Sequence, residues 1–168
     1  MSTVVHEELK KKNIKNFTRE TMQEIGNGLR RENGDDILAR RAIKYLRKQK
    51  MDRVVIEGIR NPGEIQFLKK NPLFVSIGVK ARRELRFKRM SSRAKPWDPK
   101  NWDDFIKVDR NDLGIGQKDS GQQVGRCLDY CDYILTNNKG ILDFQKKVKE
   151  LTKRILLYCT HNSGPTSP

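Results

Sequence analysis

The sequence predicts an α/β fold built on a parallel sheet. Three short apolar runs, at residues 53–57, 73–79 and 132–136, are suited to buried strands. Helical segments separate each run from the next, and strands joined through crossover helices pair in parallel. The chain has 168 residues, of which 35% are hydrophobic, and this suffices for one domain with one core.

Local signals place the first helices. Residues 4–12 form a short helical pattern, and Thr18 can cap a helix that runs to about residue 31. The pair Asn33-Gly34 breaks that helix. Residues 35–49 then carry apolar side chains along one helical side, which predicts another helix.

The remaining helices lie around the second and third apolar runs. Asn61, Pro62 and Glu64 form a helix start with a capping box, and the helix ends before Asn71. Further helices are predicted at residues 81–90, 102–108, 120–131 and 141–157.

Charge and composition limit the class of protein. The net charge is +15, and residues 1–100 carry +14 of it, which favours a polyanionic partner such as a nucleotide or nucleic acid. Solvated lysine-rich helix faces explain part of this charge. No run approaches the ~20 apolar residues of a membrane span, so no membrane association is expected. Three cysteines without zinc-site spacing indicate reduced thiols in a cytoplasmic protein and no metal site.

The ends of the predicted strands are the places where ligands bind in such sheets. Glu57 ends the first run, and Arg60 follows at a helix entrance, where an anion is favoured. A strand-end carboxylate can orient a nucleophile or hold a water of Mg²⁺. An ordinary strand-to-helix turn explains the same residues equally well.

An arginine stripe follows the second run. Arg82, Arg86, Arg89 and Arg93 are spaced for one helix face, and Glu84 alone does not balance them. This favours a phosphate or nucleic-acid contact over a solvated face. The following loop holds Trp97 and Trp102, which suit either a lid over a ligand or a small packed lobe.

Two further elements carry candidate residues. Asn137 opens a polar turn after the third run, which suits either contact with a base or a plain turn. Arg30 lies at a helix end, where a cation is also expected from the helix dipole.

The order of these motifs resembles the P-loop nucleoside-monophosphate kinase group, in particular dephospho-CoA kinase-like and deoxynucleotide monophosphate kinase-like proteins. The match runs from about Val5 to Leu156 and rests on four segments: residues 29–34, 55–62, 86–93 and 132–137. The resemblance implies a three-layer parallel sheet with helices on both faces. It also implies a domain over residues 1–158, with a lid at about 81–110.

The resemblance also implies roles. Arg60, with Arg30 and Arg86, would bind the substrate, Arg60 gripping the acceptor's phosphate. Arg89 and Arg93 would touch the donor phosphates, and Glu57 would help to organise Mg²⁺. Asn137 would lie near the base of the donor. ATP and Mg²⁺ are the cofactors of the family, and the acceptor would be a deoxynucleoside monophosphate or a dephospho-CoA-like molecule.

The departure from the family is large, because the 168 residues contain no Gly-x-x-x-x-Gly-Lys-Ser/Thr sequence. In the family this loop and its strand precede the segment matching residues 2–12. Either the chain starts at an internal methionine of a longer gene, or the strand is missing from the sheet. A missing strand would leave an open slot, through which the chain could associate with itself.

Three functions therefore stay open. The first is a kinase-like domain that is inactive as this chain because the P-loop is absent. The second is a non-catalytic nucleotide-binding domain that regulates a deoxycytidylate-type deaminase, since similar P-loop domains precede such deaminases and residues 159–168 have the composition of a tail or linker. The third is a basic nucleic-acid-binding module. One observation argues against it: the aromatic residues do not interleave with the basic ones, as they do in proteins that stack bases.

Overall fold

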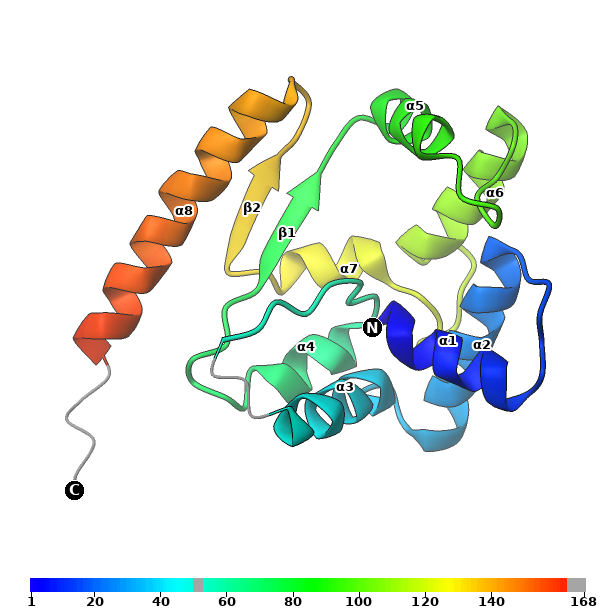
Figure 1. Cartoon of the computed structure of the whole chain (residues 1–168), viewed down its shortest axis with the longest axis horizontal. Coiled ribbons are helices and arrows are strands. Elements are labelled where there is room, and N and C mark those ends of the chain that lie inside the picture. Colours follow the sequence, from blue (N-terminus) through cyan, green and yellow to red (C-terminus); the bar gives the residue numbers. More distant parts are fainter. Residues whose placement is uncertain (50–52, 163–168) are drawn as a thin grey trace.

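The computed structural model describes residues 1–49 and 53–162. Helices predominate in this part of the chain, and two short strands lie between them (Figure 1). In chain order the elements are α1 Ser2–Lys11, α2 Arg19–Asn33, α3 Ile37–Lys48, α4 Pro62–Leu68, β1 Ile77–Lys80, α5 Arg83–Arg93, α6 Trp102–Leu113, α7 Val124–Asp129, β2 Tyr133–Thr136 and α8 Ile141–Asn162.

Two of the predicted helix starts are confirmed in detail. The Thr18 hydroxyl accepts a hydrogen bond from the backbone N–H of Thr21, and the Thr21 hydroxyl accepts one from the N–H of Thr18. At α4 the Asn61 side chain accepts from the N–H of Gly63, while Glu64 accepts from the N–H of Asn61. These caps satisfy donors that the first helical turn leaves without partners.

The helices α1 to α4 form what we call the helical lobe. Its core consists of aliphatic side chains that are at most 9% exposed. They are Met1, Val4, Val5, Leu9, Leu29, Ile37, Leu38, Ala39 and Leu68. Helix α1 packs on α2 and α3, and α3 packs on α4, so each helix of the lobe buries one face against a neighbour.

The strands β1 and β2 pair in parallel, with Ile77 opposite Tyr133 and Lys80 opposite Thr136. This confirms the α/β class and the parallel pairing. Helix α8 packs alongside β2 at the outer side of the pair (Figure 1). Gly78 allows close packing under the strands, because a Cβ there would lie 2.7 Å from a methyl group of Leu128, in α7. We call β1, β2 and α8 the strand lobe.

The predicted first strand, at residues 53–57, is wrong. This segment is irregular coil in the structure, and the Val55 residue is 96% exposed. An apolar run becomes a strand only where a neighbouring strand supplies backbone partners. The described residues form a sheet of two strands, and the carbonyl of Glu57 instead accepts a hydrogen bond from the amino group of Met1.

Other boundaries also shift. The strand β1 starts at Ile77, four residues later than predicted, because residues 72–76 form a turn and coil. Helix α6 continues to Leu113 instead of ending at Val108. Helix α8 runs to Asn162, so residues 159–162 of the predicted tail are helical, and residues 163–168 lie outside the described part of the chain. Within the described residues, none of the helices combines the length and the apolar character needed to cross a membrane.

Candidate functional site: an arginine cluster on helix α6

The turn before α4 is held rigidly by buried polar groups. The Asn61 amide donates to the carbonyls of Asp119 and Gly121, at 2.8 and 2.9 Å. One carboxylate oxygen of Glu64 accepts from the N–H groups of Arg60 and Asn61. The loop that precedes α7 is therefore tied to this turn, and the backbone of Arg60 has a defined position.

Arg30 serves this same turn from the inside. Its guanidinium donates twice to Glu64 Oε1, at 2.9 and 2.7 Å, and once to Asn27. The side chains of Arg30 and Glu64 are 1% and 0% exposed. Arg30 was predicted to bind substrate. In the structure its guanidinium is buried and forms an ion pair with the Glu64 carboxylate, so it is not accessible to a ligand. Its role here is structural.

Arg60, in contrast, reaches the surface. Its Nη1 lies 3.1 Å from Asp112 Oδ1 and 3.5 Å from Gln122 Oε1. Its side chain is 29% exposed. The Asp112 carboxylate also accepts from Gln23 and forms a second ion pair, at 3.3 Å, with Arg19. Two arginines of different elements thus share one carboxylate of α6.

The arginines of α5 reach α6 as well. Arg83 pairs with Asp109 at 3.0 Å, and Arg86 contacts both carboxylate oxygens of Asp109. Asp109 is 4% exposed. From the sequence only Glu84 was counted against the arginine stripe, whereas in the structure α6 supplies a further carboxylate, which lies 23 residues away from Arg86 in sequence.

Asp109 and Asp112 are three residues apart in α6, so their side chains neighbour each other on the helix surface. Together they contact four guanidinium groups. We call this set the α6 arginine cluster: Arg19, Arg60, Arg83, Arg86, Asp109 and Asp112. Its formal charge is +2, because four cations share two carboxylates. Two of the predicted phosphate-binding residues, Arg60 and Arg86, belong to it.

Arg89, one turn beyond Arg86, joins α5 to the turn after β2. Its guanidinium donates to the carbonyls of Asn137 and Lys139, at 2.8 and 3.1 Å. The Asn138 side chain accepts from the N–H of Arg82 at the start of α5. The structure therefore brings Arg89 and Asn137 together. The contact that joins them uses the backbone carbonyl of Asn137, and among the described residues the side-chain amide of Asn137 has no hydrogen-bond partner.

Arg93 lies apart from this group. Its guanidinium makes three hydrogen bonds to Asp98, which is 5% exposed. This pair fixes the loop that follows α5. The two tryptophans of the predicted lid pack in different places: Trp97 against Phe17, and Trp102 against Phe87 and Phe105. The structure thus brings Arg93 together with its own loop and with no other predicted site residue.

Glu57 is exposed, at the end of the irregular segment 53–57. Its backbone carbonyl is engaged with Met1, but its carboxylate joins no cluster of acidic groups. In the described residues no three His, Cys, Asp or Glu side chains are placed to hold one metal ion. A single exposed carboxylate binds Mg²⁺ only weakly. The residues present therefore do not fit a metal centre of their own.

The two cysteines whose side chains the structure describes, Cys127 and Cys131, do not form a reactive site. The described thiols of Cys127 and Cys131 are free. Burial raises the pKa of Cys127 to about 12, with the negative charge of Glu64 adding to the effect. Burial also raises the pKa of Cys131. Because the thiolate is the nucleophile, neither side chain is prepared for nucleophilic chemistry near neutral pH.

Several residues of the α6 arginine cluster are absent from the sequence-based prediction. Asp109 and Asp112 were missed because the helix was predicted to end at residue 108. A usable signal exists in Gly114, which adopts a left-handed conformation, with φ of 96°, where α6 ends. Extending the helix to that glycine would have placed both aspartates on one face. Arg19 and Arg83 have no comparable local signal.

The fold and this cluster define an α/β protein that carries an excess of positive charge at the α6 arginine cluster. Comparison with known proteins identifies the family. The UPF0200 protein of Staphylothermus marinus is 31% identical over 140 residues, which cover 83% of this chain and 70% of that protein. The chain belongs to the UPF0200 family.

Two other relatives extend the match. The UPF0200 protein of Pyrococcus horikoshii is 29% identical over 161 residues, covering 93% of this chain and 82% of that protein. The one of Methanocaldococcus jannaschii is 27% identical over 158 residues, covering 93% and 76%. A scan against models of protein families gave no match. The names of these relatives state the family and no activity.

Proposed function

We propose that the chain is a nucleotide-binding domain of the nucleotide kinase-like type, with the α6 arginine cluster as its phosphate site. The observation that supports this proposal is the charge imbalance at α6, where four guanidinium groups share Asp109 and Asp112. A phosphate dianion would balance the two excess charges. Guanidinium groups bind phosphate oxygens in a bidentate way, which a lysine cannot do.

The ligand would enter by displacing carboxylate contacts of Arg60 and Arg86, whose side chains are 29% and 36% exposed. Arg60 comes from the turn before α4, and Arg86 comes from α5. A phosphate held by both would join the helical lobe to the predicted lid. Arg19 and Arg83 keep their carboxylate partners meanwhile, so Asp109 and Asp112 are not left without a cation.

Further parts of the proposal come from the kinase resemblance. The acceptor is a deoxynucleoside monophosphate or a dephospho-CoA-like molecule, and the donor is ATP. Arg89 and Asn137 serve the donor side. The two observed strands belong to a wider parallel sheet, which is the middle layer of a three-layer fold with helices on both faces. Because the 168 residues hold no Gly-x-x-x-x-Gly-Lys sequence, we expect this chain alone to bind nucleotide without transferring phosphate.

Isothermal titration calorimetry at about 20 mM salt tests the binding, with thymidine monophosphate, dephospho-CoA and ATP as separate ligands. We expect Arg60→Ala and Arg86→Ala each to weaken binding about tenfold or more, since a hydrogen bond to a charged group contributes about 1.5–3 kcal/mol. The matched control is Arg126→Ala, which removes an exposed ion pair with Asp119 outside the cluster.

Three outcomes decide the proposal. Loss of affinity in both cluster variants, with Arg126→Ala unchanged, supports it. Failure of all three ligands to bind the folded chain overturns it. Phosphate transfer from ATP to either acceptor, measured with this chain alone, overturns the part that excludes transfer.

A further inference from the structure

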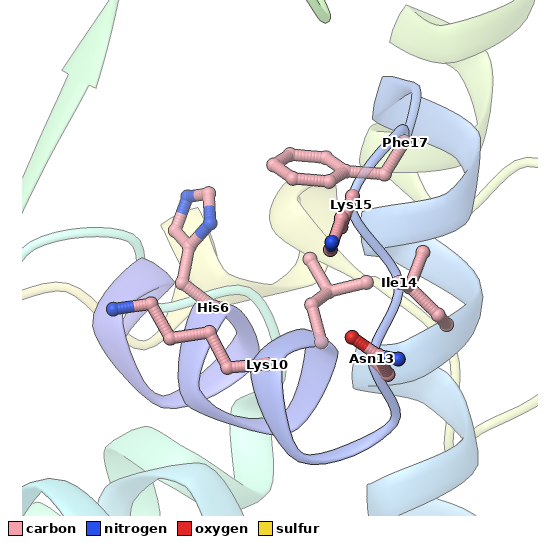
Figure 2. Close-up of a pocket in the computed structure, with 7 residues that line it drawn as sticks. His6, Lys10, Asn13, Ile14, Lys15 and Phe17 are labelled. Atoms are coloured by element: carbon pink, nitrogen blue, oxygen red, sulfur yellow. The ribbon is translucent and has the colours of Figure 1, made fainter.

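A hollow lies at the end of α1, where the chain turns back over that helix (Figure 2). Its volume is about 390 Å³, within the usual range for small-molecule sites. The turn is made at Asn13, which has a left-handed backbone with φ of 55°. The residues that line it are His6, Leu9, Lys10, Asn13, Ile14, Lys15 and Phe17.

Aromatic rings from three separate segments meet beside this hollow. The ring of Phe17 stacks on Trp97 with centroids 5.6 Å apart, and the ring of His6 meets both edge-on, at 5.4 and 5.5 Å. His6 belongs to α1, and Trp97 belongs to the loop between α5 and α6. All three side chains are partly buried, so part of each remains open to solvent.

Positive charge surrounds these rings. Lys10 and Lys15 line the hollow, and the Lys95 amine lies 5.3 Å from the centre of the Trp97 ring. No carboxylate lines the hollow. On α1, Glu7 is exposed beside His6, and Glu8 is engaged by Arg41 and Lys11. In the described part of the chain, neither Lys10 nor Lys15 forms an ion pair. The cations at the hollow are therefore available to an anion.

The sequence hid this arrangement. Lys10, Lys15 and Phe17 belong to one short segment, but Trp97 lies 80 residues beyond Phe17, so the pairing of these two rings gives no local signal. Folding places them together, in the combination of flat rings and cations that holds a base and its phosphate. Leu9 and Ile14 contribute apolar atoms to the lining of the hollow.

We infer that this hollow binds a nucleotide unit, that is, a nucleobase carrying phosphate. The base contacts the Phe17 ring over Ile14, the Asn13 amide reaches polar atoms at the base edge, and Lys10 and Lys15 neutralise the phosphate. The unit comes either from a free mononucleotide or from a single strand. This site shares no residue with the α6 arginine cluster, so the inference does not rest on the proposed function.

Fluorescence of Trp97 tests this inference in the full chain carrying Trp102→Phe. The probes are adenosine monophosphate and a twelve-nucleotide oligothymidine at about 20 mM salt. Both are also titrated into the Arg60→Ala/Arg86→Ala background, so that failure at one site is distinguished from failure at the other. We expect quenching that persists in this background.

Two variants address the contacts. Phe17→Leu keeps an apolar side chain against the core but removes the ring, and Lys15→Ala removes a cation of the hollow. Phe17→Leu is expected to weaken binding about fivefold or more, because stacking contributes about 1–3 kcal/mol per base. Lys15→Ala is expected to weaken binding because it removes a charge that attracts the phosphate. Lys12→Ala is the matched control, since Lys12 belongs to the same segment but does not line the hollow.

Either probe binding with this variant pattern supports the inference, and the tighter probe identifies the source of the unit. Absence of binding by both probes overturns it. Equal losses in Lys12→Ala and Lys15→Ala also overturn it, because they indicate general attraction to a basic surface.

Discussion

The helical lobe buries its apolar side chains, whereas the strand lobe leaves many of them in solvent. Leu9 and Leu38 are 1% and 2% exposed, but Val79 of β1 is 51% exposed and Leu142 of α8 is 78% exposed. Burial of apolar area is the main favourable term in folding. The stability of the chain therefore resides in the helical lobe, and the strand lobe depends more on individual polar contacts.

The polar contacts of the two lobes differ in the same way. In the helical lobe the Arg30–Glu64 pair is fully buried. At the start of the strand lobe, Asp132, just before β2, accepts from the N–H and hydroxyl of Ser76, just before β1, and from Lys69 near the surface. A buried pair is costly to break, and an exposed one is not. The following substitutions test this difference.

Glu64→Gln should destabilise the chain most. It removes the negative partner of Arg30 and leaves a buried cation without compensation, which costs about 3–5 kcal/mol. Urea unfolding followed by circular dichroism measures the loss. The control is Asp36→Asn, which removes the exposed partner of Arg40 and should cost less than about 1 kcal/mol. Equal losses in the two variants would contradict the assigned structural role of Arg30.

A matched pair of apolar truncations compares the lobes directly. Leu38→Ala leaves a cavity in the helical lobe and should cost about 2–5 kcal/mol. Ile134→Ala removes a side chain of β2 that is 41% exposed and should cost less than about 1 kcal/mol. The same urea experiment measures both. Similar losses would show that the strand lobe contributes as much burial as the helical lobe.

The pH dependence of stability should reveal how much the ionised Asp132 side chain contributes to the free energy of unfolding. Burial raises its pKa, but hydrogen bonds from Lys69 and Ser76 outweigh burial and lower it below the usual value. A lowered pKa in the folded state stabilises the fold above the unfolded value of about 3.9, and this stabilisation is lost as pH falls through the folded value. Asp132→Asn should therefore flatten the acid limb of a melting-temperature profile.

Asp119→Asn serves as the matched control for Asp132→Asn, because the Asp119 side chain is 91% exposed. It should leave the acid limb unchanged. An identical profile in wild type and Asp132→Asn would show that the contacts of Asp132 with Ser76 and Lys69 do not persist in solution.

The free edge of β1 offers the mildest test. Within the described residues β1 pairs with β2 alone, and an edge of this kind with exposed Ile77 and Val79 favours association between copies of the chain. The charge of +15 opposes it at low salt. Light scattering after size exclusion should therefore show a mass above that of a monomer in 0.5 M salt at high concentration, and Val79→Lys should reduce it. A clean monomer under these conditions would contradict association through this edge.

The helices were largely predictable because their signals are local. The caps at Thr18 and Asn61 lie within three residues of the groups that they satisfy. The parallel pairing of the second and third apolar runs was also predictable, since a helical connection between strands favours it. The first run, at residues 53–57, was not, because forming a strand there requires a neighbour that the local sequence does not specify.

The candidate site was predictable in part. Arg60 and Arg86 were expected at a phosphate site, and the structure brings both to α6. Arg30 carries the same kind of side chain at a comparable position, yet it is buried on Glu64, which lies 34 residues away. Sequence patterns cannot separate an arginine that neutralises a buried carboxylate from one that faces a ligand.

The amino-acid sequence alone determines the α/β class, most helix positions and the strong positive charge. These properties depend on composition and on hydrogen bonds between residues three or four positions apart. Folding in three dimensions decides which arginines are buried, which share Asp109 and Asp112, and which rings meet at the hollow beside α1. Such contacts join segments that are distant in sequence, and their energies depend on burial, which exists only in the folded chain.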